Sequence, residues 1–78
     1  MSKVTITVMP RVETLDPQGQ AVAGALSHLG FDTVGDVRIG KHIVLEITGD
    51  DPAAQAHAMC DKLLVNKLIE DYTVSIDD

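Results

Sequence analysis

The segment closest to a known chemical motif is Gly35 to Lys41, which reads G-D-V-R-I-G-K. Its glycines and lysine have the spacing of a loop that holds phosphate groups, but His42 stands where such a loop has a serine or threonine for magnesium. The loop must also lead into a helix, whereas residues 43–48 alternate in the manner of a strand. We therefore interpret the segment as a hairpin turn and not as a nucleotide-binding loop.

Few other residues are placed for catalysis or metal binding. His57 and Cys60 are three positions apart and could be neighbouring ligands on a helix, but Cys60 falls in an apolar stripe and no third ligand is evident. This is the only cysteine, so no intramolecular disulfide can form. The adjacent carboxylates at 50–51 are explained by helix capping, and those at 70–71 suit a solvated surface or an interface. We expect no catalytic residue, metal site or bound cofactor in this chain.

Length and composition favour a small subunit over a self-contained enzyme. The chain has 78 residues, which suits one domain over 1–78 and leaves little room for a deep pocket. With 45% hydrophobic residues it is globular and not disordered. A net charge of -6, with one Tyr and one Phe, makes nucleic acid a poor partner. No segment suits a signal peptide or a membrane span, so we expect a cytoplasmic protein without membrane contact.

Apolar periodicity predicts a strand, a helix, two strands, a helix and a strand. Asp16 and Asp51 each precede a proline and begin the helices, because the carboxylate caps free amides and proline suits the first turn. The expected elements are a strand over 3–9, a helix over 17–29, a hairpin over 36–48 that turns at 40–41, a helix over 52–66 and a strand over 72–76. This order predicts the α+β class and a ferredoxin-like βαββαβ two-layer sandwich, with an antiparallel sheet and both helices on one face.

The sheet face turned away from the helices is expected to be polar but only lightly charged. We expect this face, or an edge strand, to mediate homo-oligomerisation. Its predicted residues are Thr5, Thr7, Arg38, Val44, Glu46, Thr48, Thr73 and Ser75.

Three blocks of the sequence resemble the signature of the PurS family. The blocks are L-D-P-Q-G-Q-A-V at 15–22, D-V-R-I-G-K at 36–41, and K-L-L with a later N and I-E-D-Y within 62–72. They occur in the family's order and spacing along nearly the whole chain. Lys67-Leu68 departs from the pattern, since many relatives have Pro or Thr and then Val there.

The resemblance implies a non-catalytic small subunit of phosphoribosylformylglycinamidine synthase, a ligase of de novo purine synthesis. The complex uses ATP, magnesium and glutamine to convert formylglycinamide ribonucleotide to formylglycinamidine ribonucleotide. The family's partners are a synthetase large subunit, PurL, and a glutaminase subunit, PurQ. By this resemblance the chain also forms a dimer or tetramer with itself, bridges the two larger subunits and assists ammonia transfer between them.

The residues expected at interfaces are those of the matching blocks. Arg38 and Lys41 are candidates for carboxylates on the synthetase or the glutaminase. The full set is Asp16, Pro17, Gln18, Gly19, Arg38, Gly40, Lys41, Asn66, Glu70, Asp71 and Tyr72. Asp16 and Pro17 also have a sufficient structural explanation as a helix cap. Residues 70–72 suit a contact between strand edges of two copies.

Two other functions stay open at this stage. A ferredoxin-like regulatory domain would bind a small molecule at an oligomer interface, and a ligand-dependent rise in thermal stability would indicate it. A small hydrolase resembling an acylphosphatase would need a phosphate-binding arginine loop near the first strand. Arg11 lies in that region, but no glycine-rich loop surrounds it.

Overall fold

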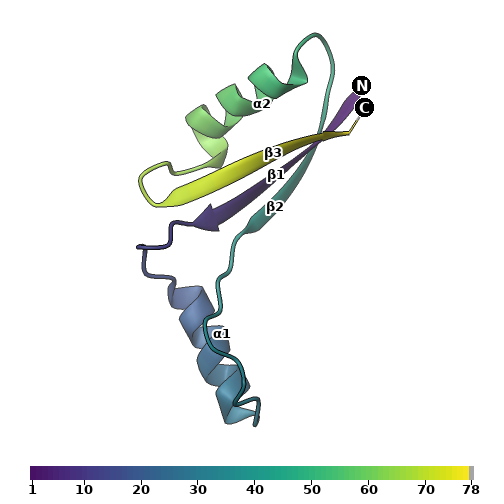
Figure 1. The fold of residues 1–78 in the computed structure, drawn as a ribbon. Helices are drawn as coiled ribbons and strands as arrows, with labels where there is room; N and C mark the ends of the chain where they lie inside the picture. The colour runs from purple at the N-terminus through teal and green to yellow at the C-terminus, as the bar shows by residue number, and fades with distance from the viewer. Residues whose placement is uncertain (78) are drawn as a thin grey trace.

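The computed structural model describes residues 1–77 as a three-stranded antiparallel sheet with one helix packed on it and a second helix beyond its end (Figure 1). The elements in chain order are β1 (Ser2–Pro10), α1 (Pro17–His28), β2 (Lys41–Ile47), α2 (Pro52–Met59), a π-helical turn η1 (Cys60–Leu64) and β3 (Glu70–Asp77). The start of β1 and the end of β3 lie side by side, with Lys3 opposite Asp77 (Figure 1).

The central strand of the sheet is β1, and the order is β2-β1-β3. It is antiparallel to both neighbours, so that Ile6 lies opposite Ile43 on β2 and Val74 on β3. Val4, Ile6 and Val8 are fully buried. The alternation that predicted a half-buried strand over 3–9 is therefore confirmed, and this strand supplies most of the core.

The helix α2 packs on the sheet over β1 and β3, and the turn η1 continues from it. Ala56 and Cys60 point into the core and are fully buried. Burial raises the pKa of the Cys60 thiol, with a smaller contribution from the charge of Asp61. Cys60, which the sequence places in an apolar stripe, is therefore a buried free thiol.

Both helices begin where the Asp-Pro pairs predict. The carboxylate of Asp16 accepts a hydrogen bond from the Gly19 amide at 2.9 Å, and the carboxylate of Asp51 accepts one from the Ala54 amide at 3.1 Å. A proline follows each cap. These bonds span three residues, so local sequence was enough to predict them.

The predicted hairpin over residues 36–48 is wrong. Within residues 1–77, the segment 36–39 pairs with no strand and runs alongside α1, and β2 begins at Lys41 (Figure 1). The Ile39 amide donates instead to the Asp16 carboxylate at 2.8 Å, so it is not free for a sheet ladder. The sheet consequently has three strands where the sequence predicted four, while the α+β class and a ferredoxin-like arrangement are confirmed.

The expected packing of both helices on one sheet face is not found within this chain. The helix α1 lies beyond the end of the sheet together with the segment that follows it (Figure 1). This placement makes the molecule long, with principal extents of 50 × 25 × 14 Å.

The outer face of the sheet has the expected polar character. Thr5 lies opposite Val44 on β2 and Ser75 on β3, so these residues share that face. Arg38, which was predicted there, lies outside the sheet because its segment is not a strand.

Replacement of Gly40 by alanine is expected to destabilise the chain. A Cβ at this position would overlap the Val8 carbonyl oxygen and the Met9 sulfur, so β1 and the segment before β2 would have to separate. We expect Gly40→Ala to lower the free energy of unfolding by about 1–3 kcal/mol, measured by urea denaturation.

Gly24 supplies the matched control, because a Cβ there has no neighbour within 4 Å. In the middle of α1, Gly24→Ala should raise stability by about 0.5–1 kcal/mol. Equal effects of the two substitutions would show that the close approach at Gly40 is unimportant.

Candidate functional site

We call residues 12–39 the arm and the remaining elements the body. One side of α1 packs against residues 36–39, which lead back to the sheet and which we call the return segment. The close approach is shown by Gly19, where a Cβ would overlap the Val37 carbonyl oxygen. The Phe31 amide also donates to the Leu26 carbonyl at 2.9 Å. The rest of the arm surface carries the exposed apolar residues Val12, Leu15, Val22, Leu29, Phe31 and Val34. The arm therefore presents a largely uncovered apolar surface.

The carboxylate of Asp16 ties the two halves of the arm together. One oxygen accepts from the Gly19 amide at 2.9 Å, and the other accepts from the Ile39 amide at 2.8 Å. The Gly19 bond, followed by the Ile39 bond, lowers the pKa of Asp16, and the nearby charge of Arg38 also lowers it. Asp16 thus caps α1, as predicted, and also positions the return segment, which the sequence did not predict.

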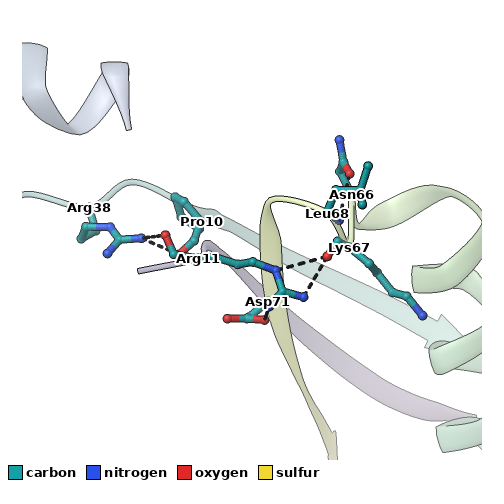
Figure 2. A network of polar contacts seen from close by, with 7 residues as sticks. All are labelled: Pro10, Arg11, Arg38, Asn66, Lys67, Leu68 and Asp71. Carbon is teal, nitrogen blue, oxygen red and sulfur yellow. Dashed lines mark hydrogen bonds and ion pairs between the residues drawn. The ribbon is translucent and has the colours of Figure 1, made fainter. Parts of the chain in front are cut away.

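The guanidinium of Arg38 binds the return segment to residues 10–11, which lead from β1 into the arm and which we call the outgoing segment. Its Nη2 donates to the carbonyl oxygens of Pro10 and Arg11, the latter at 2.7 Å (Figure 2). Its Nε is buried and has no hydrogen-bond partner among residues 1–77. Arg38 was predicted to meet a carboxylate on another subunit, and that contact stays a prediction. Its observed contacts are with backbone oxygens of its own chain.

A second arginine joins the base of the arm to the turn before β3. Arg11 Nη2 donates to the Lys67 carbonyl at 2.8 Å, and Arg11 Nε donates to the same oxygen at 3.2 Å. Arg11 Nη1 lies 3.3 Å from the carboxylate of Asp71 (Figure 2). We call Pro10, Arg11, Arg38, Lys67 and Asp71 the joint.

Arg11 is the main residue that the sequence interpretation missed. It was considered only for a phosphate loop, and no local spacing links it to Lys67, which lies 56 positions away. Its position directly after the central strand was the one available signal, because a cation there can reach the carbonyl oxygens at a sheet end.

Several predicted site residues meet at the body side of the joint. Glu70 accepts a hydrogen bond from the Asn66 amide at 2.8 Å, and its other oxygen lies 3.8 Å from Lys41 Nζ. The Asn66 side chain accepts from the Leu68 amide at 3.2 Å. The first two sequence blocks, which contain Asp16 and Arg38, thus approach the third block through Arg11.

The remaining predicted site residues lie at the margins of this region. Pro17 and Gln18 are exposed in the first turn of α1. The Tyr72 hydroxyl lies 2.8 Å from His57 Nδ1, which links β3 to α2.

An open apolar groove of about 570 Å³ lies beside α2, on the side of β2. It is lined by Leu45, Gln55, Ala58, Met59, Lys62, Leu63 and Leu64. Leu63 is 83% exposed. The apolar stripe predicted for the second helix therefore divides, because Ala56 and Cys60 enter the core while Met59 and Leu63 line the groove.

Within the described chain, no three side chains among its His, Cys, Asp and Glu residues gather closely enough to hold a metal ion. None of the helices in residues 1–77 has the length and apolar character needed to cross a membrane.

The fold and these surfaces define a class of protein: a small α+β chain whose arm and groove expose apolar side chains that another chain would cover. A family model described as "PurS: Phosphoribosylformylglycinamidine (FGAM) synthase" matches residues 3–78. The phosphoribosylformylglycinamidine synthase subunit PurS of Mycobacterium leprae is 44% identical over 75 residues, covering 96% of this chain and 95% of that protein. The chain belongs to the PurS family, as its three sequence blocks predicted.

Solved structures agree with this assignment. The structure of Bacillus subtilis PurS has a TM-score of 0.94 and 42% sequence identity, with 100% of each chain covered. A chain in the structure of PurLQS from Thermotoga maritima has a TM-score of 0.86 and 29% identity, covering 97% of this chain and 96% of that one.

The Asp16 carboxylate should make the stability of the arm depend on pH. Its folded-state pKa is lowered, so its contribution is present above the ordinary value of 3.8 and is lost as pH falls through the folded value. Asp16→Asn should therefore be less stable than the native chain at neutral pH, and the difference should shrink in acid. Denaturant unfolding at a series of pH values measures it.

Asp32→Asn is the matched control, because Asp32 is an exposed carboxylate of the same arm. At neutral pH its difference from the native chain should be smaller than that of Asp16→Asn, because no other part of the arm is tied to it. A difference for Asp16→Asn that does not change with pH would contradict the role given to the Asp16 carboxylate.

Proposed function

We propose that this chain is the non-catalytic assembly subunit of phosphoribosylformylglycinamidine synthase. It bridges the ATP-dependent synthetase PurL and the glutaminase PurQ, and it assists ammonia transfer while formylglycinamide ribonucleotide is converted to formylglycinamidine ribonucleotide. The observation that carries the proposal is membership of the PurS family over residues 3–78, together with the likeness to a chain of a PurLQS structure. ATP, magnesium and glutamine are bound by the partner subunits, in the cytoplasm.

The exposed surfaces of the chain support an assembly role. Apolar side chains lie open on the arm and in the groove, and soluble monomers rarely leave such surfaces contiguous. The alternative of a small-molecule sensor gains no support from relatives that are all named as PurS subunits.

The same surfaces support self-association. In a ferredoxin-like sandwich two helices cover one sheet face, whereas within residues 1–77 α2 is the one helix packed there (Figure 1). The groove opens beside it. The helix α1 in the arm of a second copy carries exposed apolar side chains that would fill this groove. A two-fold exchange of arms would cover both grooves with identical contacts, so the chain forms at least a dimer.

Reconstitution tests the assembly role. The expected result is that PurL and PurQ form product from glutamine at a much lower rate when this chain is omitted, because the two active sites are no longer joined. The assay measures formylglycinamidine ribonucleotide with glutamine and, separately, with ammonium chloride.

The ammonia-dependent rate is the internal control, because it needs no transfer between subunits and should depend less on this chain. Equal glutamine-dependent rates with and without the chain would reject the assembly role.

A charge in the groove should weaken self-association. We expect Leu63→Asp to raise the dimer dissociation constant at least about ten-fold, since an unpaired carboxylate would be buried under the partner's arm. Sedimentation equilibrium measures the constant.

Leu68→Asp is the matched control, because Leu68 is 87% exposed and does not line the groove. Its dissociation constant should remain near that of the native chain. If both variants dimerise equally well, the arm does not occupy the groove.

A further inference from the structure

The arm is joined to the body by two chain segments, and regular sheet pairing ends before either reaches it. The last paired residues of β1 and β2 are Val8 and Lys41. Beyond that pair the helix α1 stands clear of the sheet (Figure 1). Its direction must therefore be set by contacts at the base of the arm.

The first of these contacts is made by Arg38. Its Nη2 donates to two successive carbonyl oxygens, those of Pro10 and Arg11, so the return segment is fixed to the outgoing one at two points. A charged donor makes hydrogen bonds about twice as strong as a neutral one. Rotation of the arm about either segment would break them.

The second contact fixes the outgoing segment to the body. Arg11 donates through two nitrogens to the Lys67 carbonyl (Figure 2). Its own amide donates to the Ile69 carbonyl at 2.8 Å. The ion pair with Asp71 adds less, because that carboxylate is 64% exposed and surface ion pairs contribute little.

The contacts of Arg11 and Arg38 are continuous with those of Asp16. The carboxylate of Asp16 binds the Ile39 amide, and Ile39 follows Arg38 directly in the chain. An unbroken set of bonds thus runs from the first turn of α1 through Arg38 and Arg11 to the turn before β3.

We infer that Arg11 and Arg38 are positioning residues that lock the arm at one angle to the body, so that the arm is a rigid spacer in the free chain. The direction of the arm is therefore set before any partner binds. In the proposed assembly role, which this consequence assumes, the lock would fix the geometry between the partners that the arm and the body contact.

The lock can be tested by the distance between spin labels on the arm and the body. Ser27→Cys on α1 and Ala54→Cys on α2 place labels at exposed positions, while the native Cys60 is buried and resists labelling. Dilution with unlabelled chain leaves only distances within one chain. The measurement is made with and without Leu63→Asp, which should weaken the binding of an arm in a partner's groove, at a chain concentration below the dissociation constant of that variant.

When the joint residues are native, a narrow distribution of distances between the two labels is expected both with and without Leu63→Asp. In the presence of Leu63→Asp, Arg38→Ala should replace the narrow distribution by a broad one. Arg11→Ala should broaden the distribution, and Asp71→Asn should change it least of the three. The thermal unfolding midpoint of the body should stay close to that of the joint-intact chain in all three, which separates loss of the lock from general unfolding.

Lys67→Ala is the matched control, since the Lys67 side chain pairs with Asp61 and only its carbonyl belongs to the joint. It should keep the narrow distance. A broad distribution with the joint intact and Leu63→Asp present, or a narrow one after Arg38→Ala, would overturn the inference. Failure of reconstitution would instead reject the assembly role and leave these distances unaffected.

Discussion

The hydrogen bond from the Ile39 amide to the Asp16 carboxylate holds the segment whose placement separates this fold from the predicted four-stranded sheet. It engages the segment at 36–39 with the start of α1, so that segment does not become a fourth strand. In this three-stranded sheet, α1 lies beside its return segment and does not cover the sheet. The groove beside α2, which Leu45 of β2 lines, stays open. The arm and the groove therefore both accompany a segment that stays out of the sheet, and both expose apolar surface.

The small core gives the proposed assembly role a physical reason. The fully buried side chains come mainly from β1 and from α2 with η1, so the arm contributes almost nothing to the core. A domain of this size has a narrow margin of stability from one core. Burial of the arm and the groove against other chains would add apolar contacts that a single copy cannot make.

The parts predicted from sequence are those determined by short-range patterns. The alternation of apolar and polar residues predicted β1, and the Asp-Pro pairs, whose capping bonds span three residues, predicted the start of both helices. The apolar alternation around 36–39 was misleading, because periodicity cannot show that a distant carboxylate takes the amide of Ile39. The contact of Arg11 with the Lys67 carbonyl joins residues far apart in sequence, so spacing alone could not indicate it. Family blocks identified several of the residues that meet near the joint, but not their contacts.

The joint also affects the charge that the chain offers to its partners. The sequence has 6 basic residues, and of these Arg11, Arg38, Lys41 and Lys67 make ion pairs or hydrogen bonds within the chain. The 12 acidic residues outnumber them, and most are exposed. Arg11 and Arg38 donate to backbone oxygens of their own chain, and acidic residues outnumber basic ones, so the outward charge is predominantly negative. In the proposed assembly, a partner surface that faces these exposed carboxylates would be neutral or basic, because like charges across an interface oppose association.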